Sequence, residues 1–245
     1  MFKTFGKVKK KMKKLFLILL IIYCKIGFPQ VFETPVYYSK SHETLYIDKI
    51  EISNKNTVFY LHIENIKDAG DAWFCADKDI YVKEAGTGKK HQLIKSSGIP
   101  VCPENHKFNK KGEKLFFQLY FDKIESDKIK KIDLVENCSD YCFSFTEIIL
   151  DNKLSNEIKS FEKAIILMSS NKNSEALKEF SEFEKNVQDK NTSRYAYFLY
   201  ASSLLSYKTQ DFNKAKTQYE KLKNSTLKDR DELLEKLNEI EFFNK

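Results

Sequence analysis

The sequence predicts an α+β protein of two segregated modules, an antiparallel β-sandwich followed by a short α-helical bundle. Between about residues 45 and 150, apolar residues alternate with polar ones or form short runs rich in β-branched and aromatic side chains, which is typical of strands. After Leu150 the hydrophobic period changes to about 3.6, the period of an amphipathic helix. This change places the module boundary near residue 151.

The first thirty residues predict a signal peptide. Seven lysines between Lys3 and Lys14 are followed by nine apolar residues, 15–23. A membrane-spanning helix needs roughly 20 apolar residues, so a signal peptide over residues 1–30, cleaved between 24 and 30, is favoured over an uncleaved membrane anchor. Lipidation of Cys24 is a weaker alternative. We therefore expect an exported protein that is periplasmic, associated with the cell envelope or secreted.

The charge of the mature chain argues against nucleic acid as a partner. The full chain has a net charge of +7, but its first thirty residues hold eight of the 42 basic residues and none of the 35 acidic ones. The remaining 34 basic and 35 acidic residues nearly cancel and are interspersed. Such a surface has no single-sign field to attract phosphates, and the membrane is expected to matter only through an uncleaved leader.

Eight strands are expected in the first module, which we place over residues 37–150. They cover residues 45–52, 57–63, 72–75, 80–82, 91–94, 114–121, 129–135 and 141–150. Turn signals such as Gly70 and the pair Gly98 and Pro100 separate them, without helical crossovers, which favours an immunoglobulin-like or jelly-roll sandwich. These segments resemble an accessory β-sandwich module of exported bacterial proteins, a resemblance that supports the fold and implies no activity.

Five helical segments are expected over residues 154–245, after a linker at residues 151–153. The second and fourth segments each place apolar residues on one face: Ala176, Phe180, Phe183 and Val187 in the second, and Phe212, Ala215, Tyr219 and Leu222 in the fourth. The fifth segment is expected to begin at Thr226, which forms a capping-box pattern with Asp229.

The helical half resembles tetratricopeptide repeats, most clearly between Tyr207 and Leu222. The resemblance implies two repeats and a capping helix, in which small residues of the first helix pack against the alanine that opens the second. The packing positions are Ala164, Ala176 and Phe180 in one copy and Ser203, Ala215 and Tyr219 in the other. The two helix-opening alanines are 39 residues apart, whereas the family period is about 34, so we expect five extra residues around 188–192. The family's large aromatic near the start of the first helix is Ser160 in one copy and Leu199 in the other, and a plain helical bundle stays open.

The same resemblance implies a groove that binds a protein partner. Its lining would come from the first helix of each repeat: Ile158, Phe161, Ile165 and Met168, and then Tyr197, Tyr200, Leu204 and Tyr207. Tyrosines and methionine suit peptide recognition because they offer large apolar area, and tyrosine adds a polar tip. The alternative is that these faces are buried within the chain itself.

The four mature cysteines predict disulfides, because an even number in an exported protein is usually paired. Of the three possible pairings we favour Cys75 with Cys102 and Cys138 with Cys142. Buried thiols and redox chemistry are alternatives, although no Cys-x-x-Cys motif occurs. A metal site at Cys102 and His106 has only one such pair of ligands, so no metal and no cofactor are expected.

No arrangement of residues predicts catalysis. The chain has seven glycines and no nucleophile elbow, Walker loop or dinucleotide fingerprint. His62 and His91 fall within expected strands, and Asp77 and Asp79 are expected to face water. We therefore expect a non-enzymatic interaction or assembly factor of the cell envelope. The alternatives are a glycan-binding or small-ligand-binding sandwich that uses Trp73, Phe74 and Tyr81, and a thiol-disulfide accessory protein that uses the four cysteines.

Overall fold

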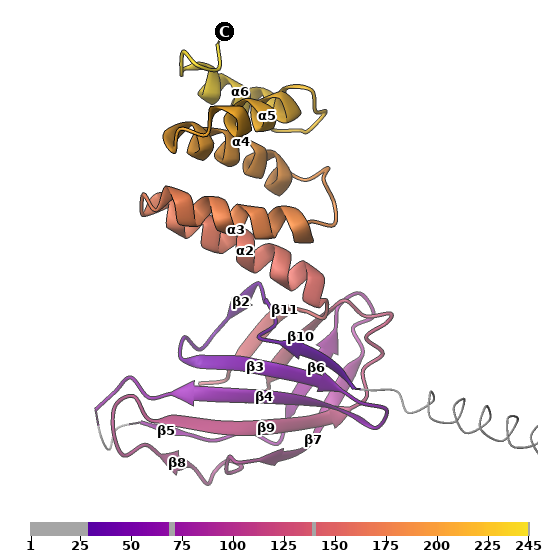
Figure 1. Ribbon diagram of the computed structural model, residues 1–245. Helices are drawn as coiled ribbons and strands as arrows, with labels where there is room; N and C mark the ends of the chain where they lie inside the picture. Colours follow the sequence, from indigo (N-terminus) through magenta and orange to yellow (C-terminus); the bar gives the residue numbers. More distant parts are fainter. Residues whose placement is uncertain (1–28, 69–71, 139–140, 245) are drawn as a thin grey trace, which may run out of the picture. The chain divides into compact units, whose positions relative to one another are not determined.

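The computed structural model describes residues 29–68, 72–138 and 141–244, and has strands followed by helices (Figure 1). The chain divides into two compact units. The β unit contains almost all of the strand residues, and the helical unit contains Pro35–Tyr38 and Ile148–Lys245. The predicted α+β layout of two modules is confirmed. Among the described residues, no helix has the length and apolar character that crossing a membrane requires.

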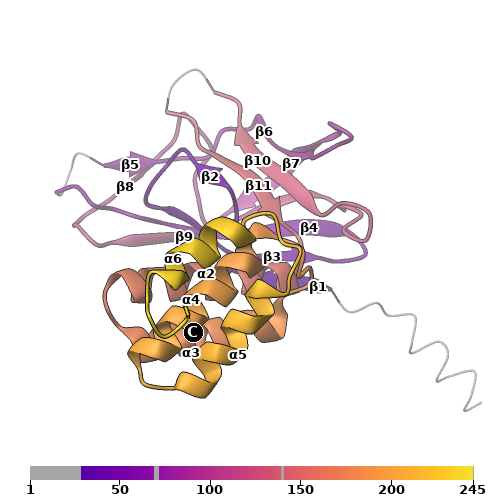
Figure 2. The ribbon, with the colours of Figure 1, turned by 90° about the horizontal axis from the view of Figure 1, so that it is seen from above.

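The β unit is one curled antiparallel sheet of nine strands with a separate two-stranded pair. The strands are β1 (Gln30–Glu33), β2 (Ser39–Lys40), β3 (Leu45–Ile52), β4 (Asn56–Glu64), β5 (Trp73–Phe74), β6 (Ile80–Glu84), β7 (Lys90–Ser97), β8 (His106–Lys107), β9 (Lys114–Asp122), β10 (Lys131–Glu136) and β11 (Ser144–Ile149). Their order in the sheet is β1-β3-β4-β9-β7-β6-β10-β11-β2, while β5 pairs with β8. Two views show β3, β4 and β9 in one layer and β6, β10 and β11 in the other (Figures 1 and 2). Strand β7 pairs with both β9 and β6 and so joins the layers.

All eight expected strands are present, and β1, β2 and β8 were not predicted. Strands β1 and β2 follow each other in the chain but lie at opposite edges of the sheet, where β1 pairs with β3 and β2 with β11. The sheet therefore begins at Gln30 rather than near residue 37. Gln30 is also the last residue of the expected signal peptide, whose residues 1–28 lie outside the described part of the chain.

Aromatic side chains fill the space between the two layers. Phe59 of β4 and Phe121 of β9 are fully buried, and their rings meet edge to face at 5.5 Å. Phe74 of β5 lies 6.0 Å from Phe117 of β9 and 6.1 Å from Phe143, which precedes β11. Side chains alternate between the two faces of a strand, so within each of these strands the neighbours of a buried aromatic residue point to the other face of the sheet.

The helical unit consists of five helices. They are α2 (Asn152–Ser169), α3 (Asn173–Asn186), α4 (Ser193–Lys208), α5 (Phe212–Lys223) and α6 (Arg230–Asn238). Asp151 caps α2 by accepting hydrogen bonds from the N–H groups of Lys153 and Leu154, so the expected linker at residues 151–153 is the first turn of the helix. The capping box expected at Thr226 is wrong. The backbone turns first, where Arg230 N–H donates to Leu227 O at 3.1 Å, and α6 begins after that turn.

The helices form two hairpins that repeat after 39 residues. Helix α2 packs along α3 and α4 along α5, and each pair is joined by three residues, 170–172 and 209–211. Asn171 and Gln210 occupy the same place in the two turns, with φ of 57° and 64°. The N–H groups of residues 170, 171 and 172 donate to the carbonyls of 166, 168 and 167, and residues 209, 210 and 211 repeat this pattern 39 positions later. Both turns are therefore Schellman-type helix ends with the same geometry.

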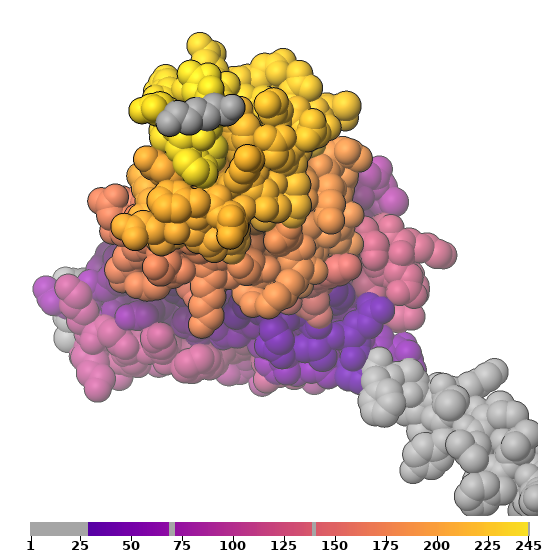
Figure 3. Space-filling model, turned by 45° about the horizontal axis from the view of Figure 1, so that its top comes forward, coloured from indigo at the N-terminus to yellow at the C-terminus, as the bar shows by residue number. Residues whose placement is uncertain are grey.

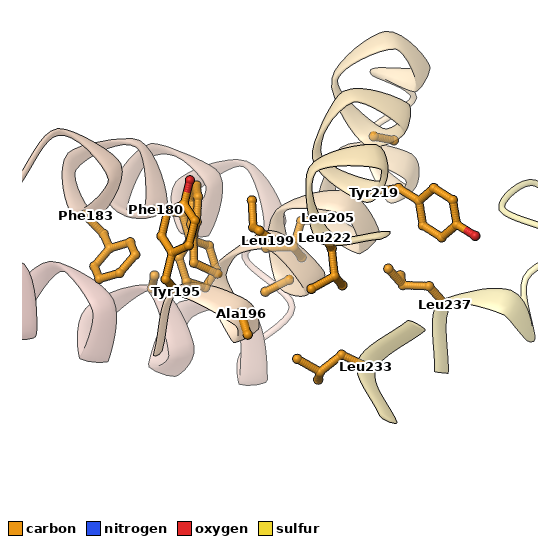
Figure 4. Close-up of a cluster of buried hydrophobic side chains, with 14 of the residues drawn as sticks. Phe180, Phe183, Tyr195, Ala196, Leu199, Leu205, Tyr219, Leu222, Leu233 and Leu237 are labelled. Atoms are coloured by element: carbon orange, nitrogen blue, oxygen red, sulfur yellow. The ribbon is translucent and has the colours of Figure 1, made fainter. Parts of the chain in front are cut away.

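The predicted packing positions lie in the core of the helical unit. Ala164, Ala176, Phe180, Ser203 and Ala215 are all fully or almost fully buried, as is Tyr219. Figure 4 shows Phe180, Phe183 and Tyr195 at one end of this core and Tyr219, Leu233 and Leu237 at the other. Residues 187–192 connect the hairpins, where the sequence predicted extra loop residues.

Candidate functional site

The predicted groove residues form two equivalent rows, one on each hairpin's first helix. The α2 row is Ile158, Phe161, Ile165 and Met168, and the α4 row is Tyr197, Tyr200, Leu204 and Tyr207. Each member of the second row follows its counterpart by 39 residues, and all eight side chains are half-buried. The spacing of three and four residues places each row on one face of its helix. We call the two together the inner rows.

Phe161 belongs mainly to the core and links the two rows. Its ring lies 6.0 Å from that of Phe180 and 5.2 Å from that of Phe183, both on α3. It also meets the ring of Tyr197 edge to face at 6.0 Å. The α2 row and the α4 row are thus held together by an aromatic contact.

Tyr197 and Tyr200 form the aromatic part of the inner rows that the C-terminal segment leaves open. Their ring centroids are 5.6 Å apart. Burial raises the pKa of the Tyr200 hydroxyl, and the neighbouring Tyr197 and Glu239 raise it further, while Lys236 of α6 opposes them. Like any tyrosine hydroxyl at neutral pH, that of Tyr200 can donate a hydrogen bond, here from a largely apolar face.

Tyr207, at the other end of the α4 row, does not offer an open surface. Its ring centroid lies 5.2 Å from that of Phe242 and 5.8 Å from that of Phe243, in the C-terminal segment that follows α6. The end of α6, just before this segment, is held by a hydrogen bond of 2.8 Å that Tyr219 Oη donates to Asn238 Oδ1. In the space-filling view the last residues, in yellow, lie against the preceding helices (Figure 3). Tyr207 therefore packs against the C-terminal segment of its own unit, and its part in a partner groove stays a prediction. The tail after α6 has no helical periodicity from which this cover could have been inferred.

Helix α6 supplies charge beside Tyr200. A groove of 530 Å³ on this helix is lined by Asp231, Leu234, Glu235, Asn238 and Glu239. In the described part of the chain, Arg230 pairs with the groove residue Asp231 at 2.7 Å, and Lys236 pairs with Glu232 at 2.6 Å. Charges of both signs thus lie beside Tyr200 on the α6 side, because Lys236 and Glu239 both act on its hydroxyl.

A buried ion pair that the sequence did not reveal fixes the α2 row relative to the α4 row. Glu157 is 3% exposed, and its Oε1 accepts a hydrogen bond from Arg194 Nη1 of α4 at 2.8 Å. Its Oε2 accepts from the backbone N–H of Gln188, in the loop between the hairpins, at 3.1 Å. The partners are more than thirty residues apart, and the second hairpin has Ala196 at the equivalent position, so no local pattern or repeat signal could have found the pair.

Both predicted disulfides are present in the β unit. The S–S distances are 2.05 Å for Cys75–Cys102 and 1.99 Å for Cys138–Cys142. Glu136 links the segments that carry the two disulfides. Its carboxylate accepts hydrogen bonds from the backbone N–H groups of Asp77, which follows Cys75, and of Phe143, which follows Cys142. Burial raises the pKa of this carboxyl, as does the charge of Asp77, and the two hydrogen bonds oppose them. Two disulfides indicate an oxidising, extracytoplasmic environment.

The remaining candidates do not assemble into a catalytic or metal site among the residues described. Three of the four histidines pair singly with carboxylates, His62 with Asp48, His91 with Glu84 and His106 with Glu113. No group of three potential metal ligands occurs in those residues, and Cys102 is oxidised. Asp77 Oδ1 accepts from the N–H of Asp79 at 2.8 Å, which stabilises a turn.

The three aromatic residues proposed for glycan binding do not form one platform. Trp73 is 55% exposed, but Phe74 is buried in the core of the β unit. Tyr81 lies on β6 beneath Lys90, whose Nζ is 4.1 Å from the ring centroid. A sugar could therefore stack on Trp73 without reaching the other two rings.

The chain matches no protein-family model, and no curated protein or solved structure is significantly similar to it.

Proposed function

We propose that this protein is an exported, non-enzymatic interaction factor of the cell envelope, whose helical unit binds a segment of a partner protein at Tyr197 and Tyr200. The observation that carries the proposal is the pairing of these two rings, half-buried and adjacent, at the N-terminal end of the α4 row. The resemblance to tetratricopeptide repeats supports it, since that family binds peptides along this face.

Tyrosine suits such a face for energetic reasons. Each ring offers a large rigid area with few rotatable bonds, so little conformational entropy is lost on binding. The hydroxyl of each tyrosine adds a hydrogen-bond donor at the edge of this apolar area. Buried aromatic anchors of this kind usually provide most of the binding energy of an interface.

The charges around the face indicate the chemistry of the partner. Glu235 and Glu239 of α6 have no cation within ion-pair distance in the described part of the chain, and Glu239 lies close enough to Tyr200 to affect its pKa. A partner segment with an apolar anchor for the tyrosines and a lysine or arginine for these carboxylates would complement both features.

The two disulfides support a place outside the cytoplasm. The expected signal peptide would direct the chain out of the cytoplasm. Its cleavage can be checked by the intact mass of protein recovered from the cell envelope. Residues 1–23 still attached would favour the membrane-anchor alternative.

The proposal is tested by partner capture with a double variant, Tyr197→Ala with Tyr200→Ala. The wild-type chain is immobilised, proteins retained from envelope extract are identified, and each is purified for calorimetric titration. We expect the double variant to bind its partner at least tenfold more weakly, because both aromatic anchors are lost.

Ile166→Ala is the matched control, because Ile166 is an apolar residue of α2 that is 64% exposed and lies off the inner rows. It should bind like the wild type. Equal affinity of the double variant and the wild type would contradict the proposal.

A further inference from the structure

A second groove, with a volume of 460 Å³, opens on the exposed face of the β unit. Its lining residues come from strands β1, β3, β4 and β9 and from the end of β7. The volume lies within the range of about 300–1,000 Å³ that is usual for small-ligand sites. Sequence analysis named one of its lining residues, Gly98, as a turn signal, and none as a binding residue.

Strand register places polar side chains next to one another on the floor of this groove. Tyr60 of β4 lies opposite Lys49 of β3 and opposite Gln118 of β9, and Gln118 lies opposite Ser97 of β7. At the end of β7, Gly98 has φ of 80°, and a Cβ added there would lie 2.8 Å from the carbonyl oxygen of Phe116. A glycine is needed for the backbone to approach β9 so closely.

An aromatic ring stands exposed at the wall of the groove. Phe116 is 63% exposed, although it is a large apolar residue in the middle of a sheet face. Its neighbour His62 lies 5.4 Å away between ring centroids, and Asp48 holds His62 in place at 2.8 and 2.9 Å from Nδ1. The ring of Tyr46 stacks on that of His62, with 4.9 Å between the ring centroids. The Phe116 ring is thus supported from one side and open to a ligand on the other.

The charges of the groove do not suit an anion. Glu33 and Asp48 contribute carboxylates, and Lys49 is the cation among the described lining residues. The charge of Lys49 is partly neutralised, because its Nζ lies 3.3 Å from a carboxylate oxygen of Glu51 and 4.0 Å from the ring centroid of Tyr60. A phosphate or another polyanion would therefore meet more negative than positive charge.

We propose that this groove binds an uncharged glycan, with one sugar ring stacked on Phe116 and its hydroxyls hydrogen-bonded to Asp48, Lys49 and Gln118. A sugar ring has an apolar face of C–H groups and a rim of hydroxyls. The exposed phenyl ring complements the first, and the carboxylate, ammonium and amide groups complement the second. This site is separate from the aromatic residues around Trp73, and the proposal does not depend on the helical unit.

The test is calorimetric titration of the full mature chain, with both disulfides formed, with cellohexaose, chitohexaose and mannohexaose. At least one of these neutral probes should bind. Phe116→Ala should weaken that binding at least tenfold, and Ser97→Trp, which fills the groove without removing a contact, should weaken it by a similar factor. Both residues are exposed, so the melting temperatures should stay within about 2 °C of the wild type.

Trp73→Ala is the matched control, because Trp73 is a similarly exposed aromatic residue that does not line the groove. Its affinity for the glycan should stay within twofold of the wild type. The proposal is overturned if none of the three probes binds at millimolar concentration, if Phe116→Ala and Ser97→Trp both bind normally, or if only an anionic oligogalacturonate binds.

Discussion

Tyr200 and Tyr207 lie on the same face of α4, but they pack against different neighbours. Tyr200 stands beside Tyr197 and the polar side chains of α6, whereas Tyr207 packs against Phe242 and Phe243 of the C-terminal segment. A sequence row at helical spacing identifies which residues share a face. It does not identify which of them another part of the chain covers.

This difference predicts unequal effects of alanine substitution. Tyr207→Ala should lower the free energy of unfolding by about 2–4 kcal/mol, because it leaves a space between α4 and the C-terminal aromatic residues. Tyr200→Ala should cost at least about 1 kcal/mol less, since it removes fewer packed neighbours. Urea denaturation of the two variants measures both values. Equal losses would mean that Tyr200 is as firmly packed as Tyr207 and would weaken its assignment to a binding face.

Glu84 predicts a dependence of stability on pH. Its carboxylate is 5% exposed, and burial by itself opposes its charge. Hydrogen bonds from Thr87 at 2.6 Å and His91 at 2.8 Å outweigh burial and lower its pKa. A carboxyl whose pKa is lower in the folded state stabilises the fold above its unfolded pKa of about 4.3, and this contribution is lost as the pH falls through the folded value.

Glu84→Gln should therefore be less stable than the wild type at pH 7 and should lose less stability on acidification below about pH 4.3. Unfolding free energies from urea denaturation between pH 3 and 7 measure the two slopes. Glu104→Gln, at an exposed position, is the control and should follow the wild type. An unchanged acid slope in Glu84→Gln would contradict the role given to its carboxylate.

At the scale of elements, the two helical hairpins repeat in their turns as well as in their apolar faces. The backbone bonds of both Schellman turns coincide after a shift of 39 residues, and both place a residue with positive φ at the same position. The first turn has Asn171 there and the second has Gln210. Asparagine tolerates this left-handed conformation better than glutamine, and glycine adopts it without strain.

Gln210→Gly should accordingly raise the free energy of unfolding by up to about 1 kcal/mol, while Asn171→Gly should change it by less than about 0.5 kcal/mol. The two variants are matched, because they alter equivalent turns. Thermal and urea unfolding of each variant and of the wild type provide the comparison. A loss of stability in Gln210→Gly would show that the glutamine side chain contributes more than its backbone strain costs.

Elements with a long, strong period were predictable, whereas β5 was the only one of the three two-residue strands that the sequence predicted. Strands β3, β4 and β9 have eight or nine residues in a clear alternation, and the sequence indicates each of them. Strands β2 and β8 have two residues each and exist only because a neighbouring segment pairs with them. Local propensity cannot reveal an element whose hydrogen bonds come from distant residues.

The candidate sites divide in the same way. Both disulfides and the inner rows could be inferred from cysteine number and helical spacing. The Glu157–Arg194 pair and the Phe116 groove could not, because both depend on which distant segments meet. Phe116 in particular belongs to an alternating strand in which its inward neighbour Phe117 looks equally apolar in sequence.

For the whole molecule, the change of hydrophobic period near residue 151 agrees with the boundary between the two units, which falls after Glu147. The β unit has the disulfides and the Phe116 groove, and the helical unit has the inner rows. The two proposals therefore concern different units, a glycan for the β unit and a protein segment for the helical unit.

The most direct test of the protein-binding face is photo-crosslinking of the full chain in its cell envelope. A benzophenone amino acid replaces Tyr200 in one variant and Thr217, an exposed residue of α5, in the other. We expect the probe at position 200 to give one discrete adduct that contains a partner protein, and the probe at position 217 to give none. No adduct from position 200, or the same adducts from both positions, would contradict the account.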